Sequence, residues 1–406
     1  MINLETPKKF RGLVDQAHRV AREIFRSNSR RYDRAEHAYP KELDMLGALI
    51  DGMNAGAGGE HAGAAGVCRN GDAGEGNRNG ANLSTVLGAI ELCWGDVGFL
   101  LSLPRQGLGN AAIASVASDA QLQRFHGKWA AMAITEPHCG SDSAAIRTTA
   151  RLDGEHYVLN GDKIFVTAGE RAELIVVWAT LDRNAGRAAI KSFVVEKGTP
   201  GLELVRLEHK LGIRSSDTAQ FALRDCRVPK ENLLGDPQVH ADKGFAGVMQ
   251  TFDNTRPLVA AMAVGLARAC LDETRRLLAD AGVAVDYDRP AQVQPAAAAE
   301  LLRLEADYEA AHLLTLQAAW MADNRKPNSL QASMAKAKAG RSCVDIALSC
   351  VELAGALGYA EGEAGHGLLE KWARDAKILD IFEGTQQIQL LIIARRLLGK
   401  TSAELK

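Results

Sequence analysis

The sequence lacks the features of secreted and membrane-spanning proteins. Its seven cysteines form no Cys-x-x-Cys pair, and an odd number argues against a framework of disulfides. No uninterrupted apolar run reaches the roughly 18 residues that span a bilayer. The N-terminal residues include no apolar signal region. We therefore expect no membrane span and a reducing, cytoplasmic setting.

An excess of charge of either sign is also missing. The chain has 48 Lys and Arg residues against 50 Asp and Glu residues, a net charge of −2. This balance provides no attraction for nucleic acid or for an anionic membrane surface. The sequence also contains no His-Glu-x-x-His, no Gly-x-Ser-x-Gly and no clustered metal ligands. We expect neither a nucleic-acid partner nor a metal site.

The two ends of the chain have a helical pattern. Apolar residues recur at helical spacing between residues 7 and 55, again from 83 to 125, and from about 242 to the end. Residues 56–80, by contrast, are dense in Gly, Asn and Asp, which predicts a flexible surface loop.

The middle of the chain is rich in predicted strands. Short apolar stretches from residue 130 to 234 are separated by the turn signals Asp153-Gly, Asn160-Gly and Pro200-Gly. The order helix, sheet, helix predicts a mainly α protein with an inserted β-domain. The expected domains are a helical domain over 1–129, a β-domain over 130–238 and a helical bundle over 239–406.

Glu383 stands out as a candidate catalytic residue. It precedes a glycine and lies between two helical patterns, at 368–379 and 387–398. A carboxylate at such a corner can point into the core, where desolvation raises its pKa and makes it a usable base near neutral pH. A solvated loop glutamate is the alternative interpretation.

Several motifs then occur in the order typical of one flavoenzyme family. They are Ile134-Thr-Glu-Pro-His-Cys-Gly-Ser-Asp, Asn160-Gly-Asp-Lys-Ile-Phe-Val-Thr, Leu211-Gly-Ile-Arg-Ser-Ser-Asp-Thr, Val228-Pro-Lys-Glu-Asn-Leu-Leu-Gly, Phe252-Asp-Asn-Thr-Arg-Pro and Phe382-Glu-Gly-Thr. Together they resemble the acyl-CoA dehydrogenase family over nearly the whole chain. The resemblance implies an N-terminal helical domain, a middle β-barrel-like domain and a C-terminal four-helix bundle that drives oligomer formation.

The resemblance implies an FAD-dependent α,β-dehydrogenation of an acyl-CoA thioester to the trans-2-enoyl-CoA, as in fatty acid β-oxidation. Glu383 aligns with the family's general base, which removes the α-proton while a hydride leaves the β-carbon for flavin N5. Gly384 then allows a sharp turn beside the thioester. An electron-transferring flavoprotein is the implied electron acceptor.

The resemblance also assigns the binding residues. The cofactor contacts it implies are Met132, Ile134, Thr135, Ser141, Phe165, Val166, Thr167, Thr385, Gln386 and Gln387. The substrate contacts it implies are Ser141, Asp253, Arg256 and Gly384. Structural alternatives exist for three of these groups. Thr385 can cap a helix, Asp253 and Arg256 can form a salt pair at i, i+3, and the loop from Met132 to Ser141 can be an ordinary turn.

The C-terminal bundle departs from the family pattern at two places. The family's Arg-x-x-Phe-Gly, whose arginine reaches the flavin of a neighbouring subunit, is missing from residues 280–295. The family's adenine loop, Gln-x-x-Gly-Gly-x-Gly, here reads Glu352-Leu-Ala-Gly-Ala-Leu-Gly, which places an acid near the nucleotide. These losses predict a homo- or hetero-tetramer, with a related partner subunit supplying the missing half-site. Arg289 within this chain is the milder alternative.

Other functions remain open at the level of sequence. A flavin oxidase or monooxygenase of the same fold is one, although Glu383 argues against the monooxygenase branch. An acyl-CoA-binding subunit with little activity of its own is another. A nicotinamide site at Gly107-Leu-Gly-Asn-Ala-Ala is a weak third, because a helical pattern rather than a strand precedes it.

Overall fold

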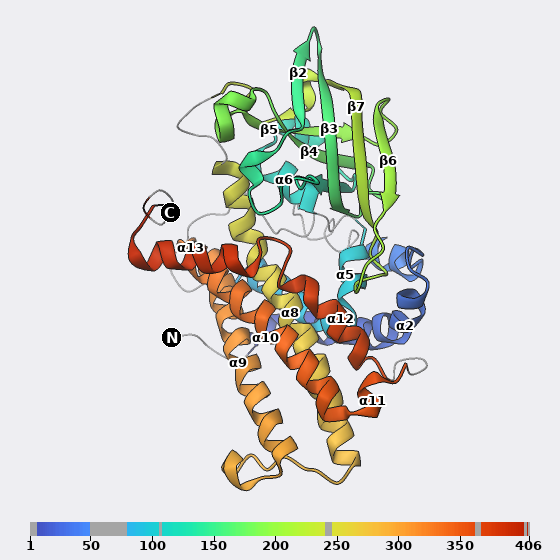
Figure 1. Cartoon of the computed structure of the whole chain (residues 1–406), viewed down its shortest axis with the longest axis vertical. Coiled ribbons are helices and arrows are strands. Elements are labelled where there is room, and N and C mark those ends of the chain that lie inside the picture. The colour runs from blue at the N-terminus through green and yellow to red at the C-terminus, as the bar shows by residue number, and fades with distance from the viewer. Residues whose placement is uncertain are drawn as a thin grey trace.

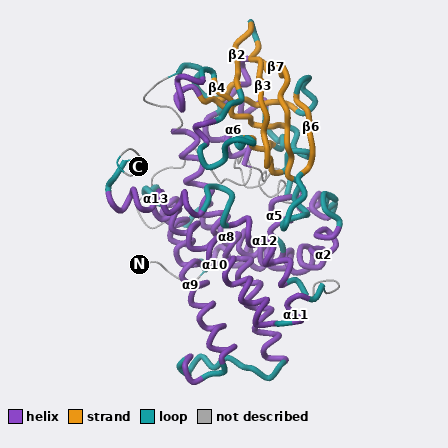
Figure 2. Tube along the Cα trace, in the orientation of Figure 1, coloured by secondary structure: helices purple, strands orange, loops and turns teal. Residues whose placement is uncertain are grey.

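The computed structural model describes residues 6–48, 79–104, 108–239, 246–361, 367–401 and 404, without the side chains of 246–254. Its strands gather at one end of the molecule, and its long helices run side by side at the other (Figures 1 and 2). The predicted loop at 56–80 lies almost entirely outside the described residues. Within the described ranges, no helix combines the length and the apolar composition needed to cross a bilayer.

The first part of the chain is helical, as predicted. Its helices are α1 (Arg11–Val20), continued by a π-helical turn (Ala21–Arg26), α2 (Ser27–Arg34), α4 (Ala81–Gly95), α5 (Val97–Ser102), α6 (Leu108–Val116) and α7 (Asp119–Arg124). Asp96 caps α5 by accepting a hydrogen bond from the Phe99 backbone N–H at 3.0 Å. Because helix α5 precedes α6, the Gly107 motif lacks the strand that a nicotinamide site requires.

The middle of the chain forms one sheet. Its strands are β1 (Ala130–Ala133), β2 (Thr149–Asp153), β3 (His156–Thr167), β4 (Leu174–Thr180), β5 (Ile190–Glu196), β6 (Leu202–Leu207), β7 (Thr218–Pro229) and β8 (Leu233–Leu234). The order is β6-β7-β3-β2-β4-β5-β8, and β1 pairs with β4 in parallel. Every residue of β4 is buried, because one apolar cluster covers each of its faces.

The turn predicted at Asn160-Gly161 was wrong. β3 continues through both residues, and the register against β7 shifts between Leu159 and Gly161. The strand needs glycine here because a Cβ on residue 161 would approach the Thr148 Cα to 2.7 Å. Asn-Gly therefore marks a bulge and a close backbone approach rather than a hairpin. The other two turn signals, at Asp153 and Pro200, do fall between strands.

The last part of the chain is the helical bundle. Its helices are α8 (Ala246–Asp280), α9 (Ala296–Asp323), α10 (Ser329–Ala354), α11 (Ala356–Tyr359), α12 (Leu369–Leu379) and α13 (Gln386–Leu398). The largest apolar cluster joins α8, α9, α10 and α12 to α4 of the N-terminal part. The cysteines within the described ranges are buried and form no disulfide.

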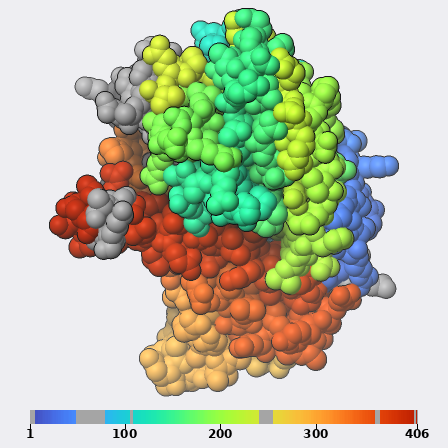
Figure 3. Space-filling view, turned by 45° about the horizontal axis from the view of Figure 1, so that its top comes forward, coloured from blue at the N-terminus to red at the C-terminus, as the bar shows by residue number. Residues whose placement is uncertain are grey.

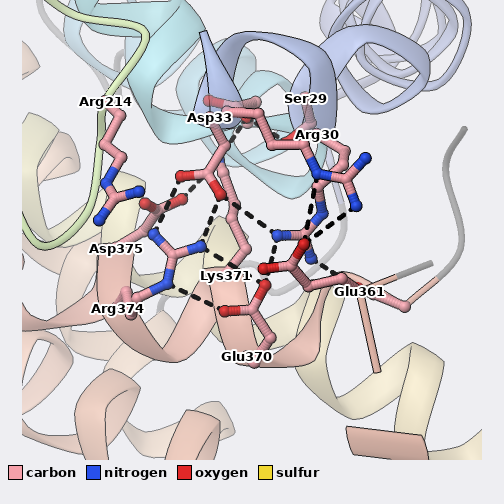
Figure 4. A network of polar contacts seen from close by, with 12 residues as sticks. Ser29, Arg30, Asp33, Arg214, Glu361, Glu370, Lys371, Arg374 and Asp375 are labelled. Carbon is pink, nitrogen blue, oxygen red and sulfur yellow. Dashed lines mark hydrogen bonds and ion pairs between the residues drawn. The ribbon is translucent and has the colours of Figure 1, made fainter. Parts of the chain in front are cut away.

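A buried ionic network ties the three parts together (Figure 4). Lys371 on α12 lies between two carboxylates, with its Nζ 2.5 Å from Asp96 and 2.6 Å from Asp375. Asp375 also accepts the Ile213 backbone N–H at 2.6 Å, which attaches α12 to a loop of the β-domain. Arg374, which lies three residues after Lys371 on α12, forms an ion pair with Asp33 of α2 at 2.6 Å.

The ion pairs of this network offset a large desolvation penalty on each buried charge. Burial lowers the pKa of Lys371, but its ion pairs with Asp375 and Asp96 outweigh burial and raise it above the ordinary value. Burial raises the pKa of Asp375 to about 6, against the opposing effect of Lys371. Removing one partner of a buried pair is therefore expected to cost far more than the pair itself contributes.

Lys371→Met should destabilise the fold strongly. Without the ammonium, the carboxylates of Asp96 and Asp375 stay buried and lose their shared partner, a loss of about 3–5 kcal/mol. Thermal unfolding of Lys371→Met and of Lys377→Met measures this, because Lys377 lies on the same helix but is exposed. Equal midpoints for the two variants would show that the network does not stabilise the domain junction.

Candidate active site

Glu383 lies in the short connection between α12 and α13, as the sequence predicted. Its backbone and that of Gly384 both adopt left-handed conformations, with φ of 57° and 89°. Two successive residues of this kind make a tight turn, and this turn fixes the direction in which the Glu383 side chain leaves the backbone. The Glu383 carboxylate is partly buried and accepts a hydrogen bond from the Thr255 hydroxyl at 2.9 Å.

The surroundings of Glu383 adjust its proton affinity in opposite directions. Burial is the largest effect and raises the pKa of Glu383 above the ordinary value. The Thr255 hydroxyl, Arg256 and Lys336 all favour the ionised form and limit this rise. A carboxylate with a raised pKa is a stronger base, and the nearby donors and positive charges favour its ionised form before a proton is taken up. The solvated-loop alternative therefore loses its basis.

Two side chains from other helices hold the backbone of this turn. Lys336 of α10, a buried lysine, donates from Nζ to the Gly384 carbonyl at 2.7 Å. Gln389 of α13 donates to the carbonyls of Glu383 and Gly384, each at 3.2 Å. A Cβ on Gly384 would lie 2.4 Å from the Gln389 amide nitrogen, and the φ of 89° would strain any residue other than glycine.

The first residues of α13 serve the helix itself. Thr385 is the N-cap, and its hydroxyl accepts the Ile388 backbone N–H at 3.4 Å, so the structural alternative for this residue is confirmed. Gln386, with its amide nitrogen turned toward acceptors, donates to the Ala337 carbonyl and the Asp380 carboxylate. Gln387 is exposed. Their predicted cofactor contacts stay predictions.

The loop that follows β1 is fixed by a second buried ion pair. Lys163 on β3 is fully buried and donates to Glu136 at 2.7 Å and to the Ile134 carbonyl at 3.0 Å. Glu136 also accepts the backbone N–H groups of Arg147 and Thr148. The loop carrying Ile134 and Thr135 is thus attached to β3 and to the start of β2.

The same attachment brings two predicted cofactor segments together. The Ile164 backbone N–H donates to the Thr135 carbonyl at 2.9 Å, so Thr135 lies beside the stretch 165–167. The β3–β7 register shifts between Lys163 and Val166, and Phe165 has a φ of 60°. This irregularity leaves the Phe165 side chain 60% exposed, whereas Val166 is buried and Thr167 partly buried.

The remaining predicted residues fall into three situations. Met132 of β1 is partly buried, Ile134 is buried, and Ser141 is exposed. Arg256 is buried on α8, next to Thr255, and its charge acts on Glu383. Asp253 lies on α8, but its side chain is outside the described residues, so the salt pair with Arg256 is not tested. In Figures 1 and 3 the teal segment following β1 borders the red C-terminal segment.

Comparison with known proteins decides the family. The middle-domain model of acyl-CoA dehydrogenases matches residues 131–226, and their C-terminal-domain model matches residues 242–398. A short-chain specific acyl-CoA dehydrogenase of Clostridium acetobutylicum is 35% identical over 270 residues, which cover 66% of this chain and 68% of that protein. The chain belongs to the acyl-CoA dehydrogenase family.

Two further relatives agree with this membership. The mitochondrial short-chain specific acyl-CoA dehydrogenase of Rattus norvegicus is 40% identical over 276 residues, 66% of this chain and 62% of that enzyme. The match therefore spans less than two thirds of that relative's length. Butyryl-CoA dehydrogenase from Megasphaera elsdenii has the same fold, with a TM-score of 0.82, 29% identity and coverage of 98% of this chain and 100% of that chain.

This acyl-CoA dehydrogenase family member contains site residues that sequence reasoning missed. Thr255, Lys336 and Gln389 contact the turn of Glu383, and Lys163 pairs with Glu136 in the loop after β1. Lys336 lies on an alanine-rich helical stretch that also carries Lys338, so the sequence alone does not single it out. The partners of these side chains are distant in sequence and come together only on folding.

One cluster of potential metal ligands also lies in the described part of the chain. Ligand atoms of Glu36, His37 and His209 lie within 4.8 Å of one another. However, Glu36 already binds His209 at 2.9 Å and the Lys210 backbone N–H at 2.7 Å. The positive charges of Lys210 and Arg214 act on the same cluster. Its single carboxylate is thus already compensated, and the cluster is no strong cation site.

Proposed function

We propose that this protein catalyses α,β-dehydrogenation of an acyl-CoA thioester to the trans-2-enoyl-CoA. The observation that carries the proposal is the placement of Glu383. Its carboxylate lies at a left-handed corner, with a raised pKa and a hydroxyl donor on one oxygen. Because the α-proton of a thioester is weakly acidic, a base of raised pKa is the group the reaction requires.

The residues of this chain have separable parts in the reaction. The ionised Glu383 carboxylate takes the α-proton, and its bond from Thr255 keeps one carboxylate oxygen oriented. Arg256 favours the ionised base before the reaction. Gly384 leaves space beside the turn, and Asp253, Arg256 and Ser141 remain the proposed substrate contacts. FAD, when bound, accepts the hydride that leaves the β-carbon.

The residues around Phe165 suit the ring end of FAD. An aromatic side chain that is 60% exposed gains by being covered, and a flat heteroaromatic ring stacks well on it. The Thr135 hydroxyl is partly exposed on the adjacent loop, and the Ser141 hydroxyl is exposed farther along it. Hydroxyl and backbone groups suit the polar edge of the ring and the chain that follows it. We infer that Met132, Ile134, Thr135, Ser141, Phe165, Val166 and Thr167 hold this end, and Thr385, Gln386 and Gln387 the ribityl-phosphate end.

The acyl chain is proposed to be short and straight. The relatives at 35–40% identity are named short-chain specific, and the similar structure is a butyryl-CoA dehydrogenase. Anaerobic addition of a panel of straight, branched and steroid-derived acyl-CoA thioesters to the purified flavoprotein tests this. Butyryl-CoA should bleach the flavin absorbance most rapidly. A flavin that no acyl-CoA in the panel bleaches would contradict the proposed reaction.

We also propose that the protein works as an oligomer with a related partner chain. The connection between α8 and α9, where the family carries an arginine for the neighbouring flavin, offers Arg289, which is exposed. Glu352 lies near the end of α10, at the position where the resemblance implies an adenine contact. Leu390, Leu397 and Leu398 of α13 are more than half exposed, as suits a helix that is covered by another subunit.

Flavin content should therefore depend on the partner. The chain purified alone is expected to hold substoichiometric FAD, because residues 280–295 lack the Arg-x-x-Phe-Gly motif and Glu352 puts a negative charge near the nucleotide. Co-expression with a homologous chain that carries Arg-x-x-Phe-Gly should restore one FAD per site, measured by absorbance after denaturation. One FAD per subunit in the lone homo-oligomer would contradict the partner proposal and favour Arg289 as the substitute.

A second candidate function follows from the same departures. A chain with an incomplete nucleotide site can bind acyl-CoA without turning it over, as a regulatory subunit does. Absence of flavin from the fully assembled complex would favour this function. Electron-transferring flavoprotein remains the proposed acceptor and the cytoplasm the proposed compartment, the latter on the basis of the buried, unbridged cysteines.

A further inference from the structure

We propose that Lys336 is the positioning residue of Glu383: its ammonium holds the Gly384 carbonyl in the left-handed turn and favours the ionised carboxylate by its charge. This inference rests on the proposed function, because it concerns the same base. No motif of the sequence assigned a role to Lys336. Its side chain is 1% exposed, so its position is set by the fold rather than by solvent.

The geometry supports the first half of the proposal. The turn at residues 383 and 384 has two carbonyl groups that leave the helical pattern, and both must find donors. Lys336 donates to the Gly384 carbonyl at 2.7 Å, and Gln389 donates to both carbonyls at 3.2 Å. Lys336 comes from α10 and Gln389 from α13, so the turn is held from two sides. These donors compensate for the strain of two left-handed residues.

The charges support the second half. The charged groups that act on Lys336 are Asp380 and Glu383, which favour the ammonium, and Arg256, which disfavours it. Burial lowers the pKa of Lys336 to about 8, so it remains mainly protonated at neutral pH. Around Glu383, the described charged groups are Lys336 and Arg256, and burial opposes both. Lys336 has a smaller effect on Glu383 than the Thr255 hydroxyl or Arg256, but it acts in the same direction, toward the ionised carboxylate.

The proposal separates Lys336 from a lysine that only stabilises the bundle. A structural lysine would affect the amount of folded protein, whereas a positioning lysine also changes the pH at which Glu383 loses its proton. Variants can separate the effect of the hydrogen bond from the effect of the charge. Lys336 supplies both a donor and a positive charge to the turn, whereas Gln389 supplies donors alone. Lys338, two residues along α10, pairs with Asp307 of α9 at 2.5 Å and serves as control.

The experiment is the pH profile of kcat/KM for Lys336→Met, Gln389→Leu and Lys338→Met in the flavin-loaded enzyme. Lys336→Met should lower kcat about 10²-fold through misplacement of the base, and should move the acid limb of the profile, where activity falls as the pH drops, to higher pH. Gln389→Leu should lower kcat without moving the limb. Lys338→Met should match wild type in both. An unmoved limb in Lys336→Met, or an equal shift in Gln389→Leu, would overturn the proposal.

A second measurement does not need turnover. Infrared difference spectroscopy follows the carboxyl band that Glu383→Gln removes, and so titrates Glu383 directly. That band should titrate at higher pH in Lys336→Met than in wild type, and unchanged titration overturns the inference even in an enzyme that proves inactive. If Lys336→Met fails to fold, Lys336→Gln loses the charge but keeps an amide donor, and must show the same upward shift.

Discussion

Replacing Glu383 by glutamine should lower the dehydrogenation rate by about 10²–10⁴-fold, the usual contribution of a positioned general base. Glutamine keeps the shape of the side chain and can still face the Thr255 hydroxyl, but it cannot accept the α-proton. The turn itself depends on backbone carbonyls that Lys336 and Gln389 hold, so the fold and the flavin content should be unchanged. Single-turnover flavin reduction with butyryl-CoA under anaerobic conditions measures the effect.

The pH dependence of kcat/KM provides a second test of Glu383 as the base. Because Glu383 must be ionised to act, kcat/KM should fall as the pH drops through its raised pKa. That limb should disappear in Glu383→Gln. Glu203→Gln is the matched control, since Glu203 is an exposed glutamate on β6. If Glu383→Gln holds flavin and reduces it as fast as Glu203→Gln, Glu383 is not the base.

Lys163→Met should have the second largest effect, on stability and on flavin content. Lys163 and Glu136 are both almost completely buried, so the methionine variant leaves an unpaired carboxylate in the β-domain. Burial lowers the pKa of Lys163, and Glu136 opposes this effect. Burial would raise the pKa of Glu136, but Lys163 and the hydrogen bonds to the loop hold it below the ordinary value. Breaking such a pair costs about 3–5 kcal/mol.

The consequence of Lys163→Met should extend to the cofactor. The ammonium also holds the Ile134 carbonyl, so the loop carrying Thr135 should lose its position beside Phe165. Lys230→Met is the control, because Lys230 pairs with Glu155 at 2.6 Å but both side chains are more than half exposed. Exposed pairs of this kind contribute at most about 1 kcal/mol. Similar melting points and FAD contents for the two variants would show that the buried pair does not support the flavin loop.

The chain's periodicities predicted its helices and strands well. The apolar run from Leu174 to Thr180, within the predicted strand-rich region, forms β4, because a continuous apolar stretch suits a strand that is covered on both faces. The helices flanking Glu383 were also predicted almost to the residue. The prediction of a turn at Asn160-Gly161 was wrong, because the dipeptide alone cannot show that the backbone at Thr148 passes close to the glycine.

The sequence by itself thus determined the order of helices and strands and the family, and it singled out Glu383 as the proposed base. Those properties follow from local spacing and from motifs of consecutive residues. Only the tertiary structure decided how the base is held, since Thr255, Lys336 and Gln389 come from three helices. The proton affinity of Glu383 is likewise a tertiary property, because it depends on burial and on charges whose distances no spacing along the chain fixes.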